Sequence, residues 1–231
     1  EMDFQRVLCL LRRLLDPTNW DLQAPFVTET TSLWDMENEC RDVAVTTWHG
    51  HAHIPRCFGK HRVLLHLFSG RRRQGDVQFF LDNMDPPTGY VLHVVSMDIV
   101  IDAQWGDATD ENARDYWLSM AHAGFIIGFL AGPPCETWSV ARGKDLHEAD
   151  GQRGRAPRVL RTAEHLWGLP SLALKEIQQL MTGNFLLTFS LLMACTMVKT
   201  GGHGVLEHPA EPDDEDLAAI WRLPAVLALL Q

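Results

Sequence analysis

Short apolar runs and amphipathic stretches alternate along the chain from residue 61 onward. Short apolar runs bounded by turn residues are typical of buried strands, whereas apolar residues at helical spacing are typical of amphipathic helices. The runs predict strands at His61–Phe68, Tyr90–Ser96, Phe125–Leu130 and Val205–Leu206. The amphipathic stretches predict helices over Asp76–Asn83, Asp110–Ala123 and Leu172–Lys199. This alternation predicts an α/β fold, with a Rossmann-like, mostly parallel sheet flanked by helices.

The first sixty residues lack this alternation and are predicted to form an N-terminal extension, so we expect a domain boundary between residues 60 and 61. Asp3–Asp16 has apolar residues at helical spacing, arginines on another face and Pro17 directly after it. This pattern predicts an amphipathic helix that packs against the main domain. Thr18–Arg41 is acidic and turn-rich, and we expect it to be irregular.

A group of histidines lies at the end of this extension. His49, His51 and His53 alternate, so they would share one face of a strand, and Cys57 and His61 follow them. Histidine and thiolate are zinc ligands. Their spacing matches no common zinc pattern, and an exposed strand or loop also carries such residues. We therefore expect no metal site.

Composition narrows the class of protein. The 231 residues are 46% apolar, which is enough for one core plus an extension. The net charge of −10 disfavours an extended nucleic-acid-binding surface, although it is compatible with local basic patches. Five irregularly spaced cysteines form no disulfide framework, and no secretory signal is visible, so we expect an intracellular protein.

One segment, Leu180–Val198, is uncharged and long enough to span a bilayer. Polar residues such as Thr182, Asn184 and Thr188 dilute its apolar character, and the α/β pattern continues on both sides. We therefore expect a buried core helix and no association with a membrane.

The stretch Gly128–Ser139, GFLAGPPCETWS, carries the main candidate for chemistry. Its apolar run stops at Gly132 and is followed by two prolines and Cys135. Pro133 and Pro134 fix their own φ angles and favour extended geometry before them, so we expect a stiff loop. Such a loop presents Cys135 at the carboxyl end of a strand, where open α/β sheets bind ligands. The alternative is that Cys135 is a small buried hydrophobic residue, the common role of a free cysteine.

The sequence AGPPCETWS around Cys135 resembles the prolyl-cysteine loop of the cytosine-5 DNA methyltransferases. Further motifs similar to those of this family occur in family order between Arg62 and Pro209. They are LFSG at Leu67–Gly70, an acidic strand end at Asp98, the pair Gly106-Asp107, the PPC of Cys135 and the strand-terminal Glu207. On this resemblance, residues 61–231 form a methyltransferase-like catalytic core.

The resemblance implies methyl transfer from S-adenosylmethionine to carbon 5 of cytosine in DNA, with the target base flipped out of the duplex. It implies that Cys135 forms a covalent adduct with the ring and that Glu207 stabilises the adduct at ring nitrogen 3. It assigns substrate binding to Ser139 and Arg142. A protein of this kind is expected in the nucleus of a eukaryote, or otherwise in the cytoplasm. The cofactor-binding residues that it implies are Phe68, Ser69, Gly70, Asp98, Ile99, Asp107, Ala108 and Pro133.

Departures from the family pattern leave alternatives open. Arg71, Arg72 and Arg73 stand where the family has further glycines, and Glu136 replaces the usual glutamine after the cysteine. The family's later motifs and its target-recognition domain have no counterpart here, so other domains of a longer polypeptide are candidate partners. The competing interpretations are a catalytically degenerate methyltransferase-like module of a larger protein, and an RNA cytosine methyltransferase.

Some local features also have two interpretations. Beside the role implied for Asp107, Thr109 or Asp110 is suited to cap the helix that follows. The Gly-containing stretch Arg142–Arg161 is either a solvated loop or a segment that contacts phosphates near Cys135. The acidic residues after Pro212 predict the start of a final helix.

Overall fold

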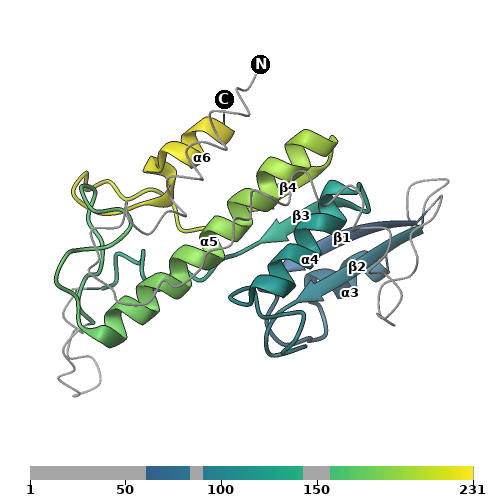
Figure 1. Ribbon diagram of the computed structural model, residues 1–231, viewed down its shortest axis with the longest axis horizontal. Coiled ribbons are helices and arrows are strands. Elements are labelled where there is room, and N and C mark those ends of the chain that lie inside the picture. The colour runs from purple at the N-terminus through teal and green to yellow at the C-terminus, as the bar shows by residue number, and fades with distance from the viewer. Residues whose placement is uncertain (1–60, 84–90, 143–156, 231) are drawn as a thin grey trace. The chain divides into compact units, whose positions relative to one another are not determined.

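The computed structural model describes residues 61–83, 91–142 and 157–230 (Figure 1). The predicted N-terminal extension, with its helix and its histidines at positions 49–53, lies outside the described residues. The described chain divides into two compact units. Of the described residues, the sheet unit contains those within 61–133 and 189–207, and the loop unit contains those within 134–188 and 208–230.

A four-stranded parallel sheet forms the centre of the sheet unit, in the order β2-β1-β3-β4. The observed sheet confirms the predicted α/β fold. The strands leave β1 in opposite directions, toward β2 and toward β3, so the carboxyl ends of β1 and β3 flank a topological switch point, where ligands bind in such sheets. The strands are β1 His61–Leu67, β2 Val91–Met97, β3 Ile126–Ala131 and β4 His203–Leu206.

Helices connect the parallel strands, as the predicted alternation requires. They are α3 Val77–Asp82, α4 Glu111–His122 and α5 Leu174–Thr200. α3 and α4 lie on opposite faces of the sheet (Figure 1), which is the arrangement that right-handed crossovers produce when strands are added on both sides of β1. The helices therefore cover the faces of the sheet and leave its carboxyl edge to loops.

The core of the sheet unit follows the alternation of β1. Val63, Leu65 and Leu67 are 0% exposed, because every second side chain of the strand points to the same face. Met120 of α4 and Ile126 of β3 are also buried. Burial of these side chains removes apolar surface from water, which stabilises the packing of α4 against the sheet.

α5 confirms the predicted long helix. Among the described residues it is the one helix that is long and apolar enough to cross a membrane, judged by length and composition alone. Within its most apolar window 67% of the residues are buried. That burial favours the predicted core helix, since a helix that is apolar over most of its surface packs inside a protein or a bilayer.

The final helix begins later than predicted. The segment after Pro212 is a series of turns, followed by the 3-10 helix η3 Ile220–Arg222 and α6 Pro224–Leu229. The Arg222 guanidinium donates hydrogen bonds to the carbonyl oxygens of Pro212, Glu215 and Leu217. Those carbonyl groups are therefore satisfied by a side chain instead of by a helix, which is why the prediction of a helix start there was wrong.

Replacing Gly106 with Ala tests how closely the backbone packs at the carboxyl edge. A Cβ atom there would overlap the carbonyl group of Asp98, and backbone cannot move aside as a flexible side chain can. We expect the free energy of unfolding to fall by about 3 kcal/mol, measured by urea denaturation. Gly124→Ala is the control, because its Cβ meets open space and it loses only about 1–2 kcal/mol through its positive φ. An equal or smaller loss for Gly106→Ala would contradict the close packing.

Candidate functional site

The end of β1 turns sharply toward β2. Phe68 and Gly70 have φ angles of 57° and 68°, so the chain makes a left-handed bend directly after the strand. The Gly70 amide donates a hydrogen bond of 2.8 Å to Asp98 Oδ2, and the Val100 amide donates one of 3.0 Å to Asp98 Oδ1. The Asp98 carboxylate thus joins the ends of two adjacent strands. The structure brings together these sequence-predicted residues at one point.

A cleft of about 310 Å³ lies at this point of the sheet unit. Its lining is mainly apolar and aromatic and includes one end of β2, the loop after it and one side of α4. This volume is at the lower end of the range for small-molecule sites. The residues that give it chemical character are Asp98, Asp102, Ile101, Trp105, Tyr116 and Trp117.

The aromatic residues of the cleft support one another. The rings of Trp105 and Tyr116 lie with centroids 4.8 Å apart, and the Trp117 indole donates a hydrogen bond of 2.7 Å to the Trp105 carbonyl. Sequence reasoning missed all three residues. The available signal was the position of Trp105 directly before the Gly106-Asp107 motif, which only a known fold turns into a place beside Asp98.

The Gly106-Asp107 motif follows the cleft. Asp107 accepts hydrogen bonds from the amide and the hydroxyl of Thr109, at 2.9 and 2.7 Å, and Ala108 is buried. Asp110 caps α4 by accepting a hydrogen bond of 3.0 Å from the Ala113 amide, so Asp110 and not Thr109 is the N-cap. Ile99, another predicted cofactor residue, is 54% exposed.

Glu207 stands at the carboxyl end of β4, as the sequence predicts. Its amide donates a hydrogen bond of 2.8 Å to the Ala131 carbonyl, which extends the pairing of β4 with β3 by one residue. A Cβ atom at Gly132 would lie 3.1 Å from Glu207 Oε2, so the carboxylate lies over the backbone of Gly132. Pro133, the next residue, is buried, whereas Glu207 is exposed.

Cys135 belongs to the loop unit and begins a turn. The Trp138 amide donates a hydrogen bond of 2.9 Å to the Cys135 carbonyl, which closes a β-turn over Cys135–Trp138. The Cys135 side chain is half-buried. The Glu136 carboxylate accepts a hydrogen bond of 3.1 Å from the side-chain amide of Gln179. These contacts extend the expected stiffness of the loop beyond its two prolines.

The two predicted substrate residues also take part in this loop. Ser139 Oγ accepts a hydrogen bond of 3.2 Å from the Ala141 amide. Arg142 donates hydrogen bonds to the carbonyl oxygens of Glu136 and Arg158, at 2.6 and 2.9 Å. The Arg142 guanidinium therefore joins the backbone directly after Cys135 to the backbone at Arg158.

Arg161 occupies the interior of the loop unit. It is 2% exposed, which excludes it from the solvated loop predicted over Arg142–Arg161, whose residues 143–156 lie outside the described chain. Its guanidinium donates hydrogen bonds to Thr137 Oγ1 and to the Leu166 carbonyl, and it stacks 3.9 Å from the centroid of the Trp138 ring. Burial, together with the nearby Arg142 guanidinium, lowers the pKa of Arg161.

Aromatic rings surround Trp138. Trp167 and His208 each lie edge-on to it, with centroid distances of 6.4 and 6.2 Å, and His208 also lies edge-on to Trp221. Burial, and to a lesser degree the Arg161 charge, lowers the pKa of His208 to about 4. His208 therefore packs among these rings in its neutral form.

The structure therefore gathers part of the predicted site. The Gly70 amide bonds Asp98, which lines the cleft, and Glu207 lies over Gly132. Cys135, Ser139 and Arg142 share one loop in the other unit. Within the described residues, no group of histidine, cysteine, aspartate or glutamate side chains could hold a metal ion. Comparison of the chain with family models, with curated proteins and with solved structures gives no match.

The buried His208 is expected to make stability depend on pH. Because its folded pKa of about 4 lies below the ordinary value of 6.5, the neutral ring contributes stability that is present above pH 6.5. That contribution falls as the pH drops from about 6.5 to about 4. Allowing for its partial exposure, we expect a loss of about 1–2 kcal/mol, measured by urea denaturation at a series of pH values.

His208→Gln is expected to remove most of this slope. His165→Gln, a substitution of a half-buried histidine in the same unit, is the control. If wild type and His208→Gln lose the same free energy of unfolding over this pH range, the burial of a neutral His208 is wrong.

Proposed function

We propose that this chain is a methyltransferase domain that transfers a methyl group from S-adenosylmethionine to carbon 5 of cytosine in DNA, through a covalent adduct with Cys135. The observation that carries the proposal is the Asp98 carboxylate, which is held by the Gly70 amide and lines an aromatic cleft at the carboxyl end of β2. The order of the other motifs, from Leu67 to Glu207, agrees with this proposal.

The residues of the cleft fit an adenosine group. Each Asp98 oxygen accepts one backbone hydrogen bond and keeps a lone pair that can accept from a ribose hydroxyl. The indole of Trp105 and the ring of Tyr116 offer flat apolar surfaces for a purine. When bound, S-adenosylmethionine supplies a methyl group on a positively charged sulfur. Such a cofactor needs a carboxylate that accepts from the ribose hydroxyls and aromatic rings that contact the base.

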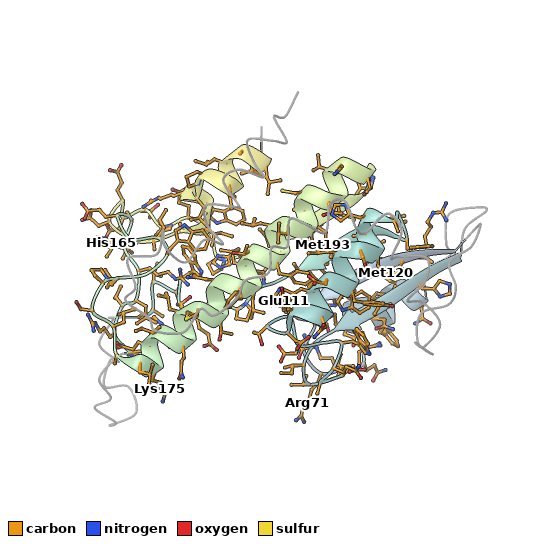
Figure 2. The ribbon with its side chains drawn as sticks, in the orientation of Figure 1. Arg71, Glu111, Met120, His165, Lys175 and Met193 are labelled. Carbon is orange, nitrogen blue, oxygen red and sulfur yellow. The ribbon has the colours of Figure 1, made fainter. Side chains whose placement is uncertain are left out.

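The arginine triplet after Gly70 leaves the cleft open. None of Arg71, Arg72 and Arg73 lines it. Arg72 forms an ion pair of 2.7 Å with Asp76, and its hydrogen bond lowers the pKa of that carboxyl. Arg71 is exposed and projects away from the sheet (Figure 2). The loss of the family's extra glycines is therefore compatible with cofactor binding.

The proposed reaction uses a thiolate and a carboxyl group on the same ring. Cytosine carbon 5 is a poor nucleophile until the Cys135 sulfur adds at carbon 6 and the displaced electron pair makes carbon 5 enamine-like. The protonated carboxyl group of Glu207 donates a hydrogen bond to ring nitrogen 3, where negative charge develops during the addition. Carbon 5 then attacks the methyl group as the bond of that group to the cofactor sulfur breaks. Water takes the carbon 5 proton, and the electron pair left behind expels the Cys135 sulfur. The base must leave the DNA stack for this to happen.

Cys135 and Glu207 belong to different units, so their shared role in this proposal rests on the order of the sequence motifs. Within the sheet unit, the Glu207 carboxylate lies over Gly132. Because Glu207 is exposed in the protein alone, a flipped base would itself provide the water-poor surroundings that strengthen the hydrogen bond.

A non-catalytic module is the second candidate. The Asp107 carboxylate, which the family resemblance directs toward the cofactor, is already bonded to Thr109, and Glu136 adds a negative charge next to Cys135. Both features favour a chain that keeps the fold without the reaction. Binding of S-adenosylmethionine distinguishes an enzyme from a non-catalytic module. Reaction with DNA or with RNA then distinguishes a DNA methyltransferase from an RNA methyltransferase.

Calorimetry with S-adenosylmethionine tests the cleft. We expect wild type to bind and Asp98→Asn to bind at least tenfold more weakly, because the variant loses a charged acceptor for the ribose. Asp110→Asn is the matched control, since asparagine is an equally good N-cap and Asp110 lies outside the cleft lining. Absence of binding by wild type would overturn the enzyme proposal and favour the module.

A covalent trap tests the nucleophile. DNA that contains 5-fluorocytosine is expected to form a stable adduct with wild type in the presence of S-adenosylmethionine, since the fluorine cannot leave as the proton does. Cys135→Ser should form none, and Glu207→Gln should react at least tenfold more slowly. Adduct formation is measured by denaturing gel electrophoresis and mass spectrometry.

Cys195→Ser is the control for the trap, because that thiol is 2% exposed and burial raises its pKa to about 12. An adduct that persists in Cys135→Ser would contradict the assigned nucleophile. RNA containing 5-fluorocytosine is run in parallel, and an adduct with RNA alone would overturn the choice of DNA.

A further inference from the structure

We propose that Arg161 is the residue that positions the Cys135 turn for reaction, acting through Thr137 and Trp138. This inference rests on the proposed function, because a positioned thiolate matters only if Cys135 attacks a substrate. Nothing in the family resemblance assigns a role to Arg161. The residue lies 26 positions after Cys135 in the sequence.

The turn that begins at Cys135 is held at each of its later residues. The Trp138 amide bonds the Cys135 carbonyl, and Arg142 bonds the Glu136 carbonyl. Arg161 then holds the remaining parts. Its Nε and Nη2 groups both donate to Thr137 Oγ1, at 3.1 and 2.8 Å, and its plane covers the Trp138 ring.

The contacts of Arg161 use the shape of a guanidinium. Two N–H groups meet one hydroxyl oxygen, a third donates 2.8 Å to the Leu166 carbonyl, and the flat face stacks on an indole. A lysine ammonium is a compact point charge that cannot make the fork and the stacking contact together. The site therefore requires arginine in particular.

Stability alone gives a weak reason to bury this side chain. Within the described part of the chain, no carboxylate pairs with Arg161, and its partners are a hydroxyl, a carbonyl and an aromatic face. A buried charge with neutral partners retains a large desolvation cost, and an apolar side chain of similar volume is often as stabilising or more so. Retaining a cation here is better explained by the precise geometry that it imposes on Thr137 and Trp138.

The neighbouring helix is adapted to the same pair. A Cβ atom at Gly183, inside α5, would lie 2.9 Å from Thr137 Oγ1 and 3.4 Å from Arg161 Nη2. Glycine inside a helix costs roughly 0.5–1 kcal/mol relative to alanine. The helix thus carries a destabilising residue at the position where the Thr137–Arg161 pair needs room.

We call the contacts of Arg161 with Thr137 and Trp138 the clamp. Losing the clamp is expected to slow the reaction, because bond formation is sensitive to the position of the attacking atom. A displacement of an attacking atom by about 1 Å can cost roughly a hundredfold in rate. Arg161 is proposed to act without touching substrate, through the turn that carries the sulfur, so it is a positioning residue.

The test compares Thr137→Val, Thr137→Ser and Arg161→Lys in the full chain. Valine keeps the shape of threonine and removes only the hydroxyl, whereas serine keeps it. Arg222→Lys is the matched control, since Arg222 also holds backbone carbonyls in the loop unit, at Pro212, Glu215 and Leu217. The readouts are the rate of adduct formation with 5-fluorocytosine DNA, the affinity for S-adenosylmethionine and hydrogen exchange of the peptide that contains the Trp138 amide.

We expect Thr137→Val and Arg161→Lys to form the adduct about ten- to a hundredfold more slowly and to exchange the Trp138 amide faster. Their cofactor affinity should stay within twofold of wild type, because the cleft lies in the sheet unit. Thr137→Ser and Arg222→Lys should react within about twofold of wild type. A purely structural role would instead speed hydrogen exchange throughout the loop unit, without a loss of adduct rate confined to these two variants.

Two results would overturn the inference. One is an adduct rate for folded Thr137→Val equal to that of wild type, and the other is unchanged exchange at Trp138. If wild type itself forms no adduct, the proposed function fails and the catalytic role of Arg161 fails with it. The clamp on the turn is then judged by hydrogen exchange alone, so the two failures are distinguishable.

Discussion

Parallel pairing of β1 with β2 on one side and β3 on the other is the constraint on which the sheet unit depends. It brings the carboxyl ends of three strands to one edge, and with them Gly70, Asp98 and Gly132. Helices occupy the faces, so only loops reach this edge. The Asp98 carboxylate then accepts a hydrogen bond from the Gly70 amide, which joins two adjacent strand ends, and Asp98 itself lines the cleft. The cleft lies at the end of β2, beside the topological switch point between β1 and β3, so its place depends on the loop after β2 and on α4 as well as on strand order.

The turn after Cys135 illustrates how a loop can be made rigid by two different means. The two prolines restrict the backbone before the cysteine, which is visible in the sequence. Beyond the cysteine, the restriction comes from the Arg142 and Arg161 guanidinium groups, which bond the Glu136 carbonyl and the Thr137 hydroxyl. Proline acts locally on its own φ angle, whereas an arginine must arrive from another part of the chain. The backbone is therefore restricted on both sides of Cys135, by the prolines before it and by the arginine contacts after it.

Sequence reasoning succeeded where one short segment carries the whole signal. The strands and the helices α3, α4 and α5 follow from hydrophobic periodicity and, for α4, from the candidate cap Asp110, and each was found to within a few residues. The last helix was misplaced because the acidic turn residues satisfy their carbonyl groups through Arg222, a contact made over several residues of sequence. The aromatic wall of the cleft was missed because Trp105 and Tyr116 come together only when the loop after β2 folds against α4.

By itself the sequence determined the α/β class, the order of its elements and the candidates Asp98, Cys135 and Glu207, since periodicity, turn residues and motif order are properties of neighbouring positions. Only the tertiary structure decided that Gly70 bonds Asp98, that Glu207 covers Gly132 and that Arg161 is buried against Thr137 and Trp138. The local sequence around an arginine in a glycine-containing segment is the same whether its side chain is exposed to solvent or buried. Its environment is set by the residues that pack around it, and these are distant in the chain.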